Sequence, residues 1–384
     1  MRILLTSTRG AGHVRPLLPY AATLATLGHD ILIAAPEDVR PIAEKAGIRF
    51  QPFGKLRDEE INRIWAEDDG DDRDKVARIG IGQLFANRTA RAAMPKLEEI
   101  LQDWHPDFVL RESVEFAGFV LAEKHHVPHA RVAVHNGQTE NMICTHGQES
   151  INALLAEQGV QPKHEHNLWA EQVFTAFPAV FDGTADHPKA QQPFRVNVLQ
   201  GETIPTSEWV PETDLPKVYI TFGTVVGGKL FNFREVFEAA IESVRGLDAE
   251  VLMTTGPNVD VSEFKNVPEN LDIRQFVPQS SVLNHVQAVV FHGGSGTLTG
   301  ALAAGVPMVV IPLFADQPMN AERVDATGLG RSVVERTPET IKAALVEVLS
   351  NSSFSERAKS AADEMENLPD LFAASHLIEE LAAN

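Results

Sequence analysis

The chain has 384 residues, of which 43% are hydrophobic and 22% charged, and this is ample material for two domains with separate cores. Its 53 acidic residues outnumber its 33 basic ones, and the net charge of -20 argues against partners such as nucleic acid or anionic membrane surfaces. A single cysteine, Cys144, excludes an intramolecular disulfide and a cysteine-rich zinc site.

The N-terminal region is predicted to form a strand, a glycine-rich loop, a helix and a second strand. Residues 3–6 are short and apolar, as in a buried parallel strand, and the turn 7–13 follows them. Residues 16–27 have apolar side chains at helical spacing, Gly28 lies just beyond them, and residues 30–35 form the next strand. This βαβ order predicts a parallel sheet.

The rest of the chain alternates in the same way. Helical patterns separate most of seven further strand-like segments, at 108–110, 129–134, 218–222, 250–254, 271–275, 288–291 and 308–311. Residues 217–224 repeat the strand-and-glycine-turn pattern of the N-terminus, and a proline-rich linker precedes them at 206–216. The fold class predicted is therefore α/β, with two domains.

No apolar stretch has the length of a membrane span, and the one at the start is too short for a signal peptide. We therefore expect a cytoplasmic protein without membrane insertion. Residues 57–75 hold nine acidic and four basic residues. Clustered carboxylates suit hard cations, but these lack the spacing of a calcium loop, so we interpret the segment as a solvated loop.

The first candidate site is the turn that contains Gly10, Gly12 and His13. Backbone N–H groups at such a helix start suit an anion or a polarised reaction centre, and histidine is the usual general base near neutral pH. A dinucleotide fingerprint would have a third glycine where Arg15 stands and an acidic residue after the second strand, where the chain has residues 34–36, Ala-Ala-Pro. A solvated histidine at a helix start is the alternative.

The second candidate site is the turn after strand 288–291, where His292 occupies the carboxyl end of the strand. Its glycines, among them Gly294 and Gly296, allow a ligand to approach the backbone, while Ser295 and Thr297 supply hydroxyl groups and the following helix supplies N–H groups. The turn therefore predicts a phosphate-binding site, although it lacks the Lys of a P-loop. The alternative is a tight turn with glycines for packing alone.

Three more candidates follow strand ends. Asp316 and Gln317 suit the recognition of several hydroxyl groups, with helix capping by Asp316 as the alternative. Phe276 could stack on a flat base and the backbone of Val277 could bind the edge of that base, although a core phenylalanine is an equal alternative.

Glu112 follows the strand at 108–110 and could orient His13, as the acid of a hydrolytic triad orients its base. The alternative is a surface carboxylate paired with Arg111. The sequence contains neither a G-x-S-x-G elbow nor an HExxH helix, which disfavours serine-hydrolase and zincin chemistry.

These motifs together resemble those of the family 1, GT-B-type inverting glycosyltransferases, in particular the bacterial enzymes that decorate natural products such as antibiotics of the macrolide type. The resemblance covers essentially the whole chain. It is carried by residues 6–13 with 16–19, and by 222–224, 277–279, 292–297, 305–307, 316–317 and 320–321.

The resemblance implies two Rossmann-like domains facing a cleft: an acceptor-binding domain at 1–205 and a nucleotide-sugar-binding domain at 217–365. It also implies a C-terminal helix within 366–384 that packs on the first domain. The implied catalytic residues are His13 as general base and Glu112, in place of the commoner Asp, as its orienting acid. The implied donor-binding residues are Gly12, Thr224, Phe276, Val277, His292, Gly294, Ser295, Gly296, Thr297, Asp316 and Gln317.

The implied reaction is inverting and independent of a metal, and it uses a UDP- or TDP-sugar as co-substrate and no cofactor. A small, hydrophobic acceptor is expected, for which Trp65, Phe85, His135 and Met142 are candidate pocket residues. A homodimer is left open. The alternatives are a GT-B-fold nucleotide-sugar epimerase, an inactive auxiliary protein and, with less support from the sequence, a NAD-dependent oxidoreductase.

Overall fold

The computed structural model describes residues 1–66, 72–161, 167–182, 191–196, 209, 213–224 and 234–383. Residues 206–208 and 210–212 of the predicted linker and residues 67–71 of the acidic segment 57–75 lie outside these ranges. By internal contacts the chain forms two compact units. The first comprises Met1–Ala176, Thr184–Val196 and Pro369–Asn384, and the second comprises Phe177–Gly183 and Asn197–Leu368. The short segment Phe177–Gly183 therefore belongs to the second unit, although the sequence placed it in the first.

The first unit is built on a seven-stranded parallel sheet of order β3-β2-β1-β4-β5-β6-β7. Its strands are β1 (Arg2–Thr6), β2 (Asp30–Ala35), β3 (Arg49–Pro52), β4 (Phe108–Glu112), β5 (His129–Val132), β6 (Val173–Thr175) and β7 (Gln191–Pro193). Its helices are α1 (Ala11–Val14), η1 (Arg15–Leu17), α2 (Leu18–Thr26), η2 (Glu37–Val39), α3 (Arg40–Lys45), α4 (Asp58–Trp65), α5 (Arg73–Ala77), η3 (Arg78–Thr89), α6 (Ala90–Trp104), α7 (Ala117–His125), α8 (Gly137–Glu157) and α15 (Leu371–Ala383).

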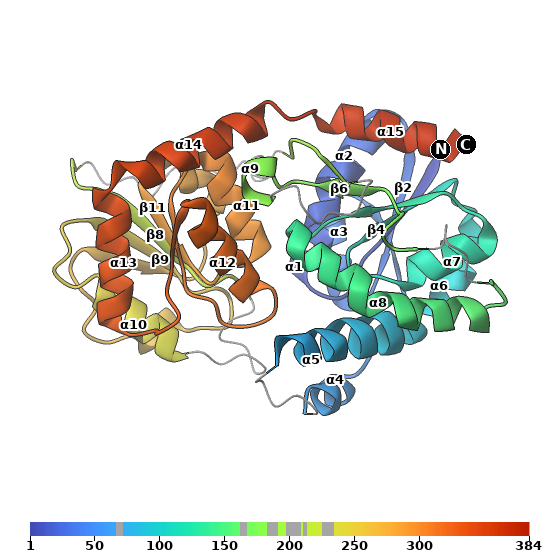
Figure 1. Cartoon of the computed structure of the whole chain (residues 1–384), viewed down its shortest axis with the longest axis horizontal. Helices are drawn as coiled ribbons and strands as arrows, with labels where there is room; N and C mark the ends of the chain where they lie inside the picture. Colours follow the sequence, from blue (N-terminus) through green and yellow to red (C-terminus); the bar gives the residue numbers. More distant parts are fainter. Residues whose placement is uncertain are drawn as a thin grey trace. The chain divides into compact units, whose positions relative to one another are not determined.

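The second unit has a six-stranded parallel sheet of order β10-β9-β8-β11-β12-β13. Its strands are β8 (Lys217–Thr221), β9 (Glu250–Thr254), β10 (Leu271–Arg274), β11 (Ala288–Phe291), β12 (Met308–Val310) and β13 (Gly330–Ser332). Its helices are α9 (Ala179–Asp182), α10 (Arg234–Ser243), η5 (Val261–Glu263), η6 (Gln279–Ser281), η7 (Leu283–His285), α11 (Ser295–Ala304), α12 (Gln317–Thr327), α13 (Pro338–Ser350) and α14 (Ser352–Glu366). The α/β fold class predicted from the sequence is confirmed (Figure 1).

At the centre of the second sheet both faces are buried, which explains why β11 and β12 are apolar throughout. In β11, Ala288 and Val290 join the core cluster that includes α10 and α13, whereas Val289 and Phe291 join the cluster that includes α11, α12 and α14. Successive side chains of a strand point to opposite faces, so helices on both sides leave no face for polar residues. Polar side chains that could bind a ligand are therefore found in the loops at the ends of the strands.

The helix predicted at 16–27 begins earlier than expected, at α1, and continues through the 3-10 turn η1 into α2. Pro16 and Pro19 lack N–H groups and cannot make regular helical hydrogen bonds to residues four positions earlier, which favours an irregular first part. The C-terminal helix α15 packs against α2, and His29 and Glu379 join them through a 2.9 Å contact between Nε2 and Oε1.

The segment 57–75, predicted as a solvated loop, instead contains α4 and α5 at its ends. The twelve-residue π-helix η3 follows and packs on α8. Gly82 permits this contact, because a Cβ on it would lie 2.9 Å from the His146 carbonyl oxygen of α8. Within the described ranges, no helix is long and apolar enough to cross a membrane.

His129, at the start of β5, is a nearly buried histidine between two glutamates. Its Nδ1 lies 3.1 Å from Glu171 Oε1 and its Nε2 lies 3.2 Å from Glu123 Oε1. Burial disfavours the charged imidazole, but hydrogen bonds and charges of the two carboxylates outweigh burial and raise the pKa of His129 to about 9. The histidine is therefore charged in the folded protein at neutral pH.

The free energy of unfolding is expected to depend on His129 in a defined pH window. Because its pKa is higher in the folded than in the unfolded state, its contribution is complete below about pH 6.5 and disappears as the pH rises through about 9. The contribution is on the order of 3 kcal/mol. Urea unfolding of the wild type and of His129→Gln checks this, because the difference between them should be larger at pH 6 than at pH 9.5.

Candidate active site

His13 lies in the short helix α1, which follows β1 after the turn at residues 7–10. Gly10, with φ of 102°, turns the chain at the start of α1, which favours a residue without a side chain. The imidazole Nδ1 lies 3.2 Å from Oε2 of Glu112, the last residue of β4. The structure therefore brings together the two residues that the sequence assigned to catalysis.

Glu112 is fully buried, so the alternative of a surface carboxylate paired with Arg111 is wrong. Its Oε1 accepts hydrogen bonds from Thr8 Oγ1 at 2.7 Å and from Thr8 N at 3.1 Å. Its Oε2 accepts from Val114 N at 2.9 Å, in addition to facing His13. Sequence reasoning missed Thr8 as a functional residue, although it lies in the first motif and precedes the glycine turn.

The electrostatics of this pair determine where the protons are. Burial opposes ionisation of Glu112, but the charge of His13 and the hydrogen bonds from His13, Val114 and Thr8 prevail and lower its pKa to about 2. An ionised carboxylate only accepts hydrogen bonds, so the Nδ1 of His13 must carry the proton that faces Glu112. The Nε2 of the neutral imidazole is then an acceptor, as a general base requires.

Two of the four residues suggested for an acceptor pocket flank His13. Its ring centroid lies 6.1 Å from that of Phe85, in η3, and 6.2 Å from that of His135, in the loop after β5. Trp65, at the end of α4, packs instead on Gly80 of η3, and Met142 lies on the partly exposed side of α8. Gly12 is exposed, and a Cβ on it would meet no atom within 4 Å.

In the second unit, the imidazole of His292 lies against two glycines. A Cβ on Gly223, which has φ of 75°, would lie 2.9 Å from His292 Cε1, and a Cβ on Gly294 would overlap His292 Nε2. Burial lowers the pKa of His292 to about 4, against the charge of Asp316. His292 is therefore a neutral hydrogen-bonding group at physiological pH.

Helix α11 begins immediately after Gly294. Its N-cap residue, Gly294, has no side chain that could cap the helix. The first intrahelical hydrogen bonds are donated by Thr297 N and Leu298 N to Gly294 O. The N–H groups of Ser295 and Gly296 come before these bonds. The Thr297 hydroxyl accepts a 2.7 Å hydrogen bond from Gln279 Nε2. An anion is favoured at such a helix start by both the N–H groups and the helix dipole.

Asp316 does not cap helix α12, as the alternative interpretation had it, because no side-chain cap is present. Its Oδ2 instead accepts hydrogen bonds of 3.0 Å from Ser295 Oγ and from Asn320 Nδ2, and the latter also donates to Gly293 O. Asn320, which the sequence placed in a motif without a role of its own, thus connects the loop at Gly293 with Asp316. Gln317 is buried and its Oε1 accepts from Leu313 N and Phe314 N, so any contact to a ligand would come from its Nε2.

Phe276 is 55% exposed, which excludes the alternative of a core phenylalanine. An aromatic ring this exposed is available for stacking on a flat ligand. The neighbouring Val277 packs on the core that includes α11. The carbonyl oxygen of Thr224 accepts a 3.2 Å hydrogen bond from Asn258 Nδ2.

Alanine substitutions at two neighbouring glycines are expected to have opposite effects on stability. Gly294→Ala places a methyl group on the His292 ring and should lower the free energy of unfolding by about 1–3 kcal/mol. Gly296→Ala meets no atom within 4 Å in the first turn of a helix and should raise it by up to about 1 kcal/mol. Thermal and urea unfolding of both variants check this, and equal effects would contradict the geometry.

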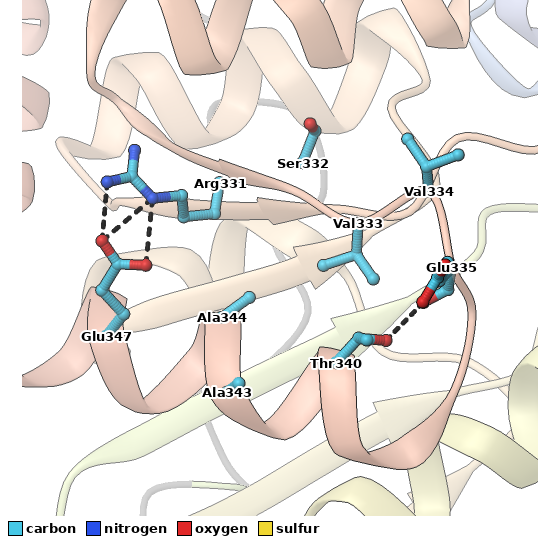
Figure 2. A pocket seen from close by; sticks show the side chains of 9 residues that line it. All are labelled: Arg331, Ser332, Val333, Val334, Glu335, Thr340, Ala343, Ala344 and Glu347. Atoms are coloured by element: carbon cyan, nitrogen blue, oxygen red, sulfur yellow. Dashed lines mark hydrogen bonds and ion pairs between the residues drawn. The ribbon is translucent and has the colours of Figure 1, made fainter.

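A separate hollow of about 370 Å³ lies beside β13 and α13 (Figure 2). The ion pair between Arg331 and Glu347 borders it, and none of the predicted site residues lines it. Among the residues with described positions, no group of three or more His, Cys, Asp or Glu side chains could hold a metal ion.

The chain matches both domain models of one protein family. Residues 22–166 match the model "Erythromycin biosynthesis protein CIII-like, N-terminal domain", and residues 238–380 match the corresponding C-terminal domain. The matches cover the segments that carry His13's partner Glu112 in one unit and the 292–297 turn in the other.

Curated relatives extend over most of the chain. An NDP-glycosyltransferase, YjiC, of Bacillus subtilis (strain 168) is 26% identical over 340 residues, which cover 83% of this chain and 81% of the relative. L-demethylnoviosyl transferase of Streptomyces niveus is 27% identical over 349 residues, with 88% and 86% covered.

Solved structures show the same fold over the whole length. Spinosyn rhamnosyltransferase SpnG has a TM-score of 0.83 at 20% identity and covers 99% of this chain and 100% of its own. Glycosyltransferase SsfS6 of Streptomyces sp. SF2575, complexed with thymidine diphosphate, has a TM-score of 0.81 at 24% identity with 99% of each chain covered.

Proposed function

We propose a sugar-transfer reaction for this chain, which belongs to the EryCIII-like, natural-product branch of the family 1 glycosyltransferases. In this reaction the sugar moves from a UDP- or TDP-sugar to a hydroxyl group of a small, hydrophobic acceptor. The configuration at the anomeric carbon is inverted. The observation that carries the proposal is the contact of 3.2 Å between His13 Nδ1 and the buried, ionised Glu112. This contact leaves Nε2 as the proton acceptor.

In the proposed reaction, His13 Nε2 removes the proton of the acceptor hydroxyl group. The oxygen then attacks the anomeric carbon from the face opposite the leaving group, the C–O bond to the diphosphate breaks, and the nucleoside diphosphate departs with the electron pair. Glu112 stabilises the imidazolium that forms and holds its ring in place, without itself taking up the proton.

The donor is proposed to bind the second unit through its diphosphate at residues 292–297. The leaving diphosphate gains negative charge in the transition state, so backbone N–H groups and the dipole of α11 stabilise that state more than the ground state. In this proposal the exposed ring of Phe276 stacks on the base, and Asp316 and Gln317 bind sugar hydroxyl groups. This stabilisation uses dipoles that are already in place and needs no divalent cation.

The acceptor is proposed to lie against Phe85 and His135, whose rings flank His13. An apolar ring at this position buries the non-reacting part of the acceptor and leaves its hydroxyl group to the base. The solved structure of spinosyn rhamnosyltransferase SpnG complexed with spinosyn aglycone supports this class of acceptor.

The proposal is tested by incubating the protein with UDP- and TDP-sugars and a panel of hydroxylated aromatic and macrolide acceptors, in the presence of EDTA. We expect a product whose mass equals acceptor plus sugar minus water, with inverted anomeric configuration by NMR. Donor turnover to an epimer without acceptor would instead support the epimerase. A thermal-shift series should show stabilisation by UDP or TDP and none by NAD, because only the former binds the folded protein.

A further inference from the structure

Arg111, the residue before Glu112 in β4, is a fully buried arginine whose whole guanidinium group has partners. Its Nε lies 2.8 Å from Glu171 Oε1, and its Nη2 donates to the second oxygen of the same carboxylate. The aromatic rings of Phe116 and Phe119 lie within 5.4 and 5.5 Å of its Cζ. Glu171 in turn accepts from His129.

The remaining nitrogen, Nη1, approaches three carbonyl oxygens of one turn. It lies 3.0 Å from Glu112 O, 3.0 Å from Ser113 O and 3.1 Å from Glu115 O. All these residues are buried, and the turn leaves the strand, so the sheet supplies no partners for carbonyls that point into the core. An apolar side chain at position 111 would remove this donor from all three carbonyls, and of the described contacts in this turn Glu112 O would keep only the 3.3 Å hydrogen bond from Glu115 N.

Stability alone is a weak reason for this arrangement. Buried ion pairs lose much of their Coulomb energy to desolvation, and well-packed apolar residues of similar volume are often as stable or more so. What a guanidinium group adds here is directional: five donors in a fixed plane hold a carboxylate on one side and a turn on the other.

The turn that Arg111 holds is the one that fixes Glu112. The Glu112 carbonyl is one of its three acceptors, and Val114 N, in the same turn, donates to Glu112 Oε2 at 2.9 Å. The carboxylate is therefore fixed by the turn on one oxygen and by Thr8 on the other, and this leaves Oε2 facing His13. We propose that Arg111, held by Glu171, is a positioning residue for the contact between Glu112 and His13, an inference that rests on the proposed function.

The test is Arg111→Lys in the full-length protein, with Arg331→Lys as the matched control. Arg331 also pairs bidentately with a glutamate, Glu347, but it is partly exposed and lies in the other unit. An ammonium group cannot reach five acceptors in one plane, so kcat should fall about 10- to 100-fold with the KM of the donor unchanged. The low-field Nδ1 proton resonance of His13, assigned by its absence in His13→Gln, should shift upfield or disappear.

A folded Arg111→Lys protein with wild-type kcat and an unchanged His13 resonance would overturn the proposal. A lower kcat with an unchanged resonance would overturn it as well, because the loss of activity would then be a structural effect that does not involve the contact between Glu112 and His13. If the lysine variant does not fold, Glu171→Gln keeps the guanidinium group, weakens its support and is judged by the same two measurements. The resonance reports the contact whatever the reaction is, so it decides the role of Arg111 even if His13→Gln retains full activity and the proposed function fails.

Discussion

Replacing His13 with alanine is expected to lower kcat by roughly 10²–10⁴-fold, the usual contribution of a single general base. The side chain is partly exposed and its removal takes one of several hydrogen-bond partners from the buried Glu112, so we expect the fold to survive at a modest cost in stability. Donor affinity should be nearly unchanged, because His13 is not among the residues proposed to hold the donor, and all of these except Gly12 belong to the second unit. Steady-state kinetics with saturating donor check the first statement, and calorimetric titration with UDP or TDP checks the second.

His376→Ala is the matched control, because His376 is an exposed histidine on α15 that, like His13, contacts a glutamate, Glu379, through its Nδ1. It should turn over like the wild type. Full turnover by His13→Ala would remove His13 from the mechanism, whereas a loss of both turnover and nucleotide binding would indicate a folding defect.

Replacing Glu112 with glutamine is expected to reduce kcat nearly as much, by about 10²–10⁴-fold, although the two side chains have the same shape. The carboxylate accepts from Thr8 on one oxygen and from Val114 and His13 on the other. An amide has one oxygen, so its NH₂ group must face the Thr8 N–H and hydroxyl on one side or the Val114 N–H on the other. If the NH₂ group faces His13, it also favours the tautomer in which Nδ1 is the acceptor and Nε2 carries the proton, and that tautomer cannot act as the base.

Three measurements separate this explanation from simple destabilisation. The free energy of unfolding of Glu112→Gln should be about 1–3 kcal/mol lower than that of the wild type, because one buried donor is left unsatisfied. The double variant with His13→Ala should be hardly slower than either single variant, since residues that act as a unit are not additive. Glu115→Gln replaces another buried glutamate, which accepts from Thr6 and Gly118 and has no contact with His13, so its kcat should stay much closer to that of the wild type.

The pH dependence of activity gives a further distinction between the groups of the site. The pKa of Glu112 is lowered to about 2, so this carboxylate is ionised at neutral pH and well below it. Burial lowers the pKa of His292 to about 4, so the donor-side histidine is neutral above about pH 5. Neither group is therefore the source of a change in rate near neutral pH.

The sequence predicted the strands of the sheet centres and the loops at their carboxyl ends, because these strands are continuous apolar runs followed by glycine. It missed β3, β7 and β13, which are short and lie at sheet edges, where burial no longer imposes an apolar pattern, and it missed β6, which is buried but only three residues long. It also missed α4, although Ile61, Ile64 and Trp65 follow helical spacing, because the acidic residues around them dominated the interpretation.

The pairing of His13 with Glu112 could be predicted because both residues follow strands that neighbour in the sheet, and such ends meet at one edge. The support of this pair could not be predicted. Arg111 seemed to be the partner of Glu112, whereas it pairs with Glu171, sixty residues later in the chain. Thr8 and Asn320 donate hydrogen bonds to Glu112 and Gly293, which are distant from them in the sequence, and local sequence patterns carry no signal for such contacts.

The turn from His292 to Thr297 contains no lysine or arginine, and it belongs to a protein of net charge -20. At a distance, such a protein repels a doubly charged nucleotide, but the Debye length of about 8 Å at physiological ionic strength confines that repulsion to the immediate surface. Backbone dipoles act at contact distance, where mobile ions do not intervene. Salt at cellular concentration therefore screens this repulsion and leaves the proposed backbone contacts to the nucleotide intact.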